Sequence, residues 1–146
     1  MPKAGGDTCT WASATNRKIP PESSCRVSQR AHALSASQRI RRRPEYLRVY
    51  EHGLRVRARL MTVIALPNTQ NCSRLGIAAT RKLGGAVVRN RAKRLVRELF
   101  RNAEVPQGLD IVVIPRPDML DADFSTLESE FRYALRHAGR RAGTGR

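Results

Sequence analysis

Residues 83–101 read LGGAVVRNRAKRLVRELFR, and the apolar pattern of this stretch decides which fold the chain can adopt. After the two glycines, apolar residues recur at spacings of three and four, which predicts an amphipathic helix over 86–102. The apolar stripe of this helix, which we expect to face a core, consists of Val88, Ala92, Leu95, Val96 and Leu99.

The remaining surface of the predicted helix is crowded with like charge. Six Arg or Lys accompany a single acid, Glu98, in the quoted stretch. Asn90 and Arg94 flank a row of basic residues spaced four apart, which is made of Arg89, Lys93, Arg97 and Arg101. Like charges at this spacing destabilise a helix by a few tenths of a kcal/mol per pair, or about 1 kcal/mol for the row. Phosphate groups along the row would remove this cost.

The charge of the whole chain points to the same kind of partner. The 146 residues carry a formal net charge of +16, and self-repulsion at that level opposes compaction unless an anionic partner offsets it. Arginine supplies 24 of the 28 basic residues, and its planar fork of donors suits phosphate, although genome base composition can produce the same bias. With 40% apolar and 5% aromatic residues, one small domain is expected. A polyanion is therefore the leading partner.

Cysteine usage and hydropathy bear on the compartment. Cys9, Cys25 and Cys72 are odd in number and form no CxxC pair, which argues against a disulfide framework or a zinc site. The sequence has no run of about 18 apolar residues and no apolar signal core at its N-terminus. We therefore expect a cytoplasmic protein.

Composition also sets the expected domain boundaries. Residues 1–37 are rich in Ser, Ala, Thr, Gly and Pro, and bury too little apolar surface to offset the entropy of ordering, so a disordered basic extension is expected. The extension also resembles an organellar transit peptide, and an upstream choice of start codon would explain it as well. The ordered domain is expected over 38–139, with a frayed basic tail over 140–146.

A short helix is expected over 44–52, just after the start of the ordered domain. Pro44 suits the first turn of a helix, and Gly53 suits a left-handed C-terminal stop. Tyr46, Val49 and Tyr50 fall on one face of this helix. The two tyrosines are either core residues or platforms that stack on unpaired bases, and the sequence alone leaves both interpretations open.

Two segments after this helix have strand patterns. The stretch RVRARLMTVIAL (55–66) alternates, with Arg55, Arg57 and Arg59 expected on one side and Val56, Ala58 and Leu60 on the other. A turn cluster at 67–71 separates it from SRLGIAAT (73–80). The simplest pairing of these two segments is an antiparallel hairpin.

The C-terminal third supplies one more strand and one more helix. LDIVVIPR (109–116) is nearly all apolar and reads as a buried strand, which after a strand and a helix favours a parallel crossover. A capping-box pattern at Ser125 and Glu128 starts the last helix, whose apolar face is Leu127, Phe131, Ala134, Leu135 and Ala138. The order of elements predicts an α+β sandwich with one small sheet.

Candidate catalytic groups are sparse. Three acids near the start of the last helix could be considered for Mg²⁺, but their position favours the helix-capping interpretation; they are Asp118, Asp121 and Asp123. The three histidines, His32, His52 and His137, are isolated, so no catalytic role is assigned to them. An active site carried by the protein itself is not expected.

The glycine pair Gly84 and Gly85 precedes the basic helix without forming a known nucleotide-binding motif. Its simplest interpretation is a flexible connection from strand to helix. A helix N-terminus beside Arg81 and Lys82 is also a suitable place for a phosphate, because its free amides and its dipole favour an anion.

From about Arg39 to His137, roughly two thirds of the chain, the sequence resembles the protein subunit of bacterial ribonuclease P. The specific part is RLGIAATRKLGGAVVRNRAKRLVRELFR (74–101), where a strand ends in a small-basic-basic triplet followed by G-x-A-V, R-N-R, K-R and R-E-x-F-R. The aromatic pair before Gly53 and the strand G-x-D-I-V-V-I (108–114) are weaker matches in the right places.

The resemblance implies a fold and an activity. The fold would be an αβββαβα two-layer sandwich with a small mixed sheet and a left-handed βαβ crossover, in place of the usual right-handed one. The activity would be endonucleolytic removal of the 5′ leader from precursor tRNA, catalysed by an RNA subunit with Mg²⁺ held mainly by that RNA. The protein would be the non-catalytic subunit that assists substrate binding.

The resemblance also implies site residues. Contacts to the RNA subunit would come from the basic helix and the basic pair before it, namely Arg81, Lys82, Arg89, Asn90, Arg91, Lys93, Arg94 and Arg97. A cleft between the first helix and the sheet would hold the single-stranded leader with Tyr46, Tyr50, Arg55, Arg57 and Arg59. No metal site on the protein is implied.

The sequence departs from the family pattern in three mild ways. The triplet has Thr80 where Ser is usual and Arg81 where Lys is usual, and tyrosine stands at 46 and 50 where the family commonly has Phe. Thr keeps a hydroxyl and Tyr keeps a stacking face.

Charge and size alone would also fit a structural RNA-binding protein of the ribosomal type or, less well, a stand-alone nuclease.

Overall fold

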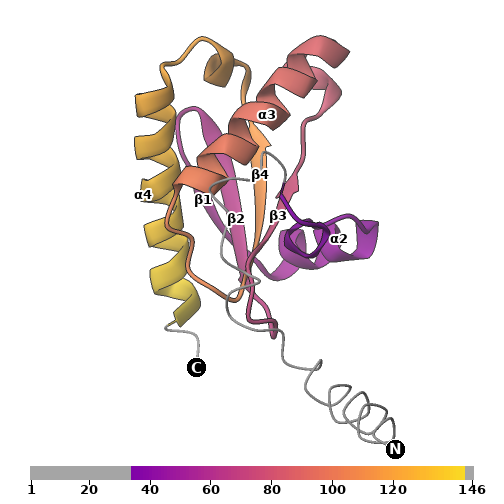
Figure 1. The fold of residues 1–146 in the computed structure, drawn as a ribbon, viewed down its shortest axis with the longest axis vertical. Coiled ribbons are helices and arrows are strands. Elements are labelled where there is room, and N and C mark those ends of the chain that lie inside the picture. The colour runs from indigo at the N-terminus through magenta and orange to yellow at the C-terminus, as the bar shows by residue number, and fades with distance from the viewer. Residues whose placement is uncertain (1–33, 144–146) are drawn as a thin grey trace, which may run out of the picture.

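The computed structural model describes residues 34–143, and the side chains of residues 34–140. The described part holds one four-stranded sheet in the order β1-β2-β4-β3, made of β1 (Leu54–Arg57), β2 (Met61–Pro67), β3 (Arg74–Ile77) and β4 (Leu109–Pro115). Its α-helices are α2 (Arg43–His52), α3 (Ala86–Asn102) and α4 (Phe124–Gly143) (Figure 1). The α+β class and the αβββαβα order are therefore confirmed.

Strand pairing differs from the simplest expectation. The stretch 55–66 is two strands, β1 and β2, which pair antiparallel across a turn where the Ala58 N–H donates to the Met61 carbonyl at 2.9 Å. β3 pairs with β4 in parallel, and β2 pairs with β4 antiparallel, so the predicted hairpin between 55–66 and 73–80 is wrong. The physical reason is burial: β4 is apolar on both faces, so it takes the place beside β2 and displaces β3 to the edge.

The β3–α3–β4 connection joins two neighbouring parallel strands. In Figure 1 both strands run upward, α3 crosses in front of the sheet, and β4 lies to the left of β3. This arrangement is the left-handed crossover that the family resemblance implied, in place of the right-handed default.

Helices cover both faces of the sheet to different extents. The larger core cluster joins α3 and α4 to one face, with Val96, Phe100 and Phe131 packed against Val63 and Ile111. A smaller cluster packs Val49 of α2 against Ile64 and Val112 on the opposite face. The two main layers are thus the sheet and the α3–α4 pair, and α2 covers only part of the other face.

The amphipathic helix predicted over 86–102 is confirmed as α3, Ala86–Asn102. Of its predicted stripe, Ala92, Val96 and Leu99 are buried and Val88 and Leu95 are half-buried; Phe100 is also buried. Gly84 has a φ of 134°, a backbone region that favours glycine, and this residue turns the chain into α3.

Two predicted helix ends need correction. Gly53 has a φ of −76°, so it is not a left-handed stop. Glycine is required at 53 for space, because a Cβ there would lie 2.3 Å from the Val49 carbonyl oxygen and 2.6 Å from Cγ2 of Ile64. The predicted N-cap Ser125 lies inside α4, which begins at Phe124 directly after Asp123.

The described fold also extends past both predicted boundaries of the domain, residues 38 and 139. Leu34, which falls inside the predicted disordered segment, is buried in the larger core cluster, so the fold begins before residue 38. At the other end, α4 continues to Gly143 and includes part of the predicted frayed tail. The remaining predictions for 1–33 and 144–146 lie outside the described residues.

The space argument for Gly53 predicts that Gly53→Ala destabilises the protein by about 1–3 kcal/mol, because the added methyl group must displace backbone atoms. The measurement is urea unfolding of the free protein. Gly139→Ala is the matched control: its Cβ would meet only Cγ of Pro106 at 3.7 Å, and removing a glycine from a helix should leave stability unchanged or raise it by up to about 1 kcal/mol. Equal effects of the two substitutions would contradict the argument.

Candidate RNA-binding surfaces

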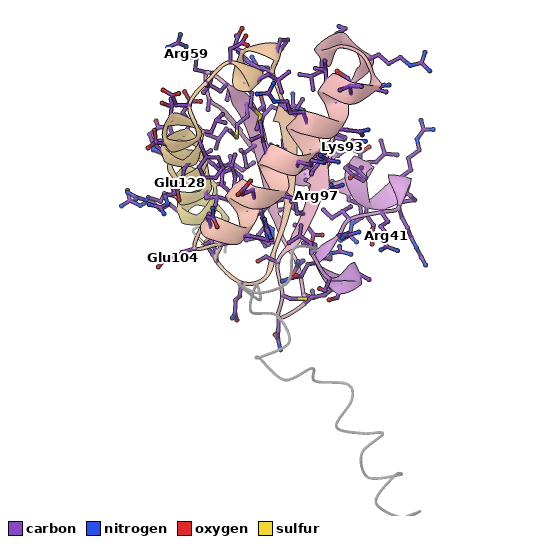
Figure 2. The ribbon with its side chains drawn as sticks, turned by 45° about the horizontal axis from the view of Figure 1, so that its top comes forward. Arg41, Arg59, Lys93, Arg97, Glu104 and Glu128 are labelled. Atoms are coloured by element: carbon purple, nitrogen blue, oxygen red, sulfur yellow. The ribbon has the colours of Figure 1, made fainter. Side chains whose placement is uncertain are left out.

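The basic row of α3 runs along one side of the helix. Arg89, Lys93 and Arg97 are half-buried, whereas Asn90 and Arg94 beside them are exposed. Figure 2 shows Lys93 and Arg97 on the side of α3 that faces α2, and Arg41, two residues before α2, across from them. The row therefore borders the β3 edge of the sheet instead of pointing straight away from the core.

The R-N-R motif does not present both of its arginines in one direction. Arg89 and Arg91 are two residues apart, which corresponds to a rotation of about 200° around the helix axis. Arg91 is exposed, on the opposite side of α3 from the row. The sequence pattern had grouped the two residues, and only their placement on the helix separates them.

The basic pair lies directly before the N-terminus of α3. Arg81 and Lys82 are exposed in a short 3-10 turn, Arg81–Leu83, whose Leu83 is buried and anchors it. Gly85 occupies the N-cap position without a side-chain capping hydrogen bond, so side chains do not cap the first N–H groups of α3 there. Two cations and a helix N-terminus thus meet at one end of the row, as expected for an anion site.

A second group of predicted residues lies on the opposite face of the sheet. Arg55 pairs across β1 and β2 with Ile64, and Arg57 pairs with Thr62, so these side chains share a face. Ile64 also contacts the α2 cluster. We call the exposed part of this region the α2-side face, defined by Tyr46, Tyr50, Arg55 and Arg57.

Arg59 does not join this group. It follows the end of β1, in the turn, where it lines a pocket with Asp118, Asp121 and Glu130. The Glu130 carboxylate accepts a hydrogen bond from the Leu60 N–H at 2.9 Å. Figure 2 shows Arg59 far from Arg41, Lys93 and Arg97. The alternation of Arg55, Arg57 and Arg59 predicted one surface, but the turn between β1 and β2 ends the alternation.

Both tyrosines are half-buried, and each packs against the smaller core cluster. The Tyr46 ring lies over Gly76, where a Cβ would come within 2.8 Å of its Cε1, and its hydroxyl accepts a hydrogen bond from the Ile77 N–H at 3.1 Å. Burial raises the pKa of both tyrosines. Each tyrosine therefore packs partly in the core, as one of the two interpretations predicted, and part of its surface stays accessible to solvent.

An ion network that the sequence did not reveal lies beside Tyr46. Arg74 donates from Nε and Nη2 to the two carboxylate oxygens of Asp110, at 2.8 and 2.6 Å, and from Nη1 to Glu45 at 2.8 Å. Asn68 adds a hydrogen bond from Nδ2 to Asp110 at 2.7 Å. One signal was available: Asp110 is the sole charge in the apolar run 109–115, and a buried carboxylate needs a partner.

The network favours the charged forms of Arg74 and Glu45. Hydrogen bonding to Asp110 raises the pKa of Arg74. Burial alone would raise the pKa of Glu45, but hydrogen bonds from the Arg74 side chain and the Arg42 backbone N–H bring it below its ordinary value.

The three acids considered for Mg²⁺ line the same pocket as Arg59, whereas the described histidines lie elsewhere. Asp118 and Asp121 are in or next to the 3-10 turn Pro117–Leu120, and Asp123 directly precedes α4. The His137 ring contacts Tyr133, with centroids 4.2 Å apart, and His52 is exposed 3.9 Å from Glu51; His32 lies outside the described residues. Among the described residues, no group of three or more His, Cys, Asp or Glu could hold a metal ion. Within the same part of the chain, no helix has the length and hydropathy needed to cross a membrane.

The fold and the two surfaces define a class: small, strongly basic α+β proteins whose parallel βαβ unit carries a row of cations on its helix. Residues 34–139 match the family described as Ribonuclease P. The chain belongs to this family, as the protein component of ribonuclease P, an endoribonuclease that matures tRNA 5′ ends.

Relatives and solved structures agree with this assignment. The chain is 36% identical over 100 residues to the ribonuclease P protein component of Caldanaerobacter subterraneus, covering 67% of this chain and 86% of the relative. It is 39% identical to that of Dehalococcoides mccartyi over 99 residues, or 68% and 82% of the two chains. The structure of the RNase P protein from Thermotoga maritima matches with a TM-score of 0.62 at 36% identity, covering 68% of this chain and 96% of that one. The structure of the Staphylococcus aureus RNase P protein matches with a TM-score of 0.62 at 32% identity, covering 69% of this chain and 94% of that one.

Proposed function

We propose that this protein binds the RNA subunit of ribonuclease P through α3 and holds the 5′ leader of precursor tRNA on the α2-side face. The observation that carries the proposal is the basic row of α3, which continues at its N-terminal end into a pair of cations and a helix N-terminus. The proposed RNA-subunit contacts are Arg81, Lys82, Arg89, Asn90, Arg91, Lys93, Arg94 and Arg97.

Charge and geometry support the α3 part of this proposal. A row of cations spaced four residues apart rises about 6 Å per step along the helix, which is close to the phosphate spacing of an RNA strand. Arg guanidinium groups bind phosphate oxygens through two parallel hydrogen bonds. Because Arg91 lies on the opposite side of α3 from the row, the RNA would have to contact the helix from two directions to reach both Arg89 and Arg91.

Half-exposed rings beside cations support the leader part of the proposal. Tyr46 and Tyr50 are fixed on their buried side by the core cluster, so they offer rigid surfaces for base stacking. Arg55 and Arg57 are exposed on the same face of the sheet and would contact the leader phosphates. Arg59 is left out of the proposed leader site because it lies in the turn among carboxylates.

The proposal assigns no bond-breaking step to the protein. In this scheme Mg²⁺ is held mainly by the RNA of the holoenzyme, as the resemblance to the family implies. The contribution of the protein is to bind and orient the RNA strands and to lower the electrostatic repulsion between two polyanions.

Reconstitution tests the function directly. We expect the protein to stimulate cleavage of precursor tRNA by a bacterial ribonuclease P RNA at low Mg²⁺ and to cut nothing by itself. Binding of RNA without any stimulation of cleavage would favour a structural RNA-binding role, and cleavage without the RNA subunit would indicate a stand-alone nuclease.

The α3 row predicts a change in salt dependence. Arg89→Ala, Lys93→Ala and Arg97→Ala should each weaken binding to the RNA subunit and flatten its dependence on salt by about 0.7–0.9 log units per lost phosphate contact. Filter binding over a range of KCl concentrations measures the slope. Arg136→Ala, an exposed residue of α4, is the control that removes the same charge elsewhere. Equal slopes for the row variants and the wild type would mean that the row does not contact RNA.

The tyrosines predict a leader-specific loss. Tyr46→Ala or Tyr50→Ala should weaken binding of precursor tRNA to the holoenzyme by about 1–3 kcal/mol per lost stack and leave mature tRNA almost unaffected. Tyr46→Phe keeps the ring and should retain the preference for leader. The experiment compares affinities for the two RNAs under conditions that block cleavage, and equal losses for both RNAs would contradict leader stacking.

A further inference from the structure

Arg74 joins three elements that are distant in sequence. Its guanidinium binds Asp110 of β4 through two hydrogen bonds and Glu45 of α2 through a third. The side chains are largely withdrawn from solvent, with relative exposures of 13% for Arg74, 9% for Asp110 and 27% for Glu45. Three of its donors are engaged by two carboxylates, so Arg74 is not a free cation for RNA despite the basic surroundings.

The two halves of the network have different roles. The Arg74–Asp110 pair links the adjacent parallel strands β3 and β4, and Asn68 holds the same carboxylate. The Arg74–Glu45 pair joins β3 to α2 and fixes the first turn of that helix. Glu45 also accepts a hydrogen bond from the Arg42 N–H through its second oxygen, at 3.3 Å, so it is oriented from both sides.

Glu45 directly precedes Tyr46 in α2. Both residues contact β3, Glu45 at Arg74 and Tyr46 two and three residues later in that strand. The Tyr46 ring lies over Gly76 and its hydroxyl accepts from the Ile77 N–H. The start of α2 is thus attached to β3 at two points, an ion pair at 74 and a packed ring at 76–77. Without the ion pair, only the Tyr46 ring and the smaller core cluster around Val49 would hold the start of α2 against the sheet.

We propose that Glu45 and Arg74 are positioning residues for the leader: their ion pair fixes α2 against β3 and thereby sets where the Tyr46 and Tyr50 rings lie on the α2-side face. This inference rests on the proposed leader site. Neither side chain contacts RNA in this scheme, and both act through the tyrosines that do.

Glu45→Gln is the informative variant. It keeps the shape and an oxygen that can accept from the Arg42 N–H, but it removes the charge that faces Arg74. The Arg74–Asp110 pair is left intact, so the sheet should fold, which substitution of Arg74 would not ensure. Glu51→Gln is the matched control: it makes the same change of charge on α2 at an exposed residue, whose carboxylate lies 3.9 Å from His52.

The measured quantity is the leader preference, defined as the ratio of the affinities of the reconstituted holoenzyme for precursor and mature tRNA. Glu45→Gln should lower this preference by about fivefold with little change for mature tRNA, whereas Glu51→Gln should leave it within about twofold of the wild type. A loss in Glu51→Gln as large as in Glu45→Gln would overturn the inference, because charge alone would then explain it. So would an unchanged preference in Glu45→Gln.

A double-mutant cycle shows whether Glu45 acts through the ring. In a Tyr46→Ala background, Glu45→Gln should cause little further loss of leader preference, because the group that it positions is gone. An undiminished further loss would overturn the inference while leaving the leader site intact. If Tyr46→Ala alone leaves the preference unchanged, the proposed leader site is wrong and the inference fails with it.

Discussion

The burial of β4 on both of its faces is the constraint on which the rest of the fold depends. Its apolar residues alternate between two clusters, with Ile111 and Val113 on the α3–α4 side and Val112 on the α2 side. Such a strand needs a neighbour at each edge and a cover on each face. β2 and β3 supply the neighbours and the helices supply the covers. The two candidate RNA surfaces follow from this requirement, since one lies beside α3 and the other beside α2.

Charge is distributed in accordance with this arrangement. Arg74 is neutralised by Asp110 of β4 and Glu45 of α2, whereas the cations of the α3 row lie half-buried along the β3 edge. A free protein with a net charge of +16 carries the cost of its own repulsion, and an RNA partner lowers that cost. The ion network thus lies where its side chains are largely withdrawn from solvent, whereas the cations of the α3 row lie where phosphates can approach.

Much of the fold could be predicted from local pattern. The helix Ala86–Asn102, the buried strand at 109–115 and the two tyrosines on one helix face all follow from periodicity, because burial imposes a period of 3.6 on helices and 2 on strands. The predictions that failed depended on neighbours. Gly53 is required by the proximity of Val49 and Ile64, and Arg59 is separated from Arg55 and Arg57 by a turn that the alternating pattern did not mark.

The sequence by itself determined the helices, the apolar segments, the charge of α3 and, through a long motif, the family. Only the tertiary structure decided which strands pair, which arginines share a surface and which one is neutralised. The reason is that periodicity reports the environment along one element, whereas pairing and ionic contacts are made between residues far apart in the chain, such as Glu45, Arg74 and Asp110. Their partners are fixed by the free energy of the whole fold, and no local pattern records that.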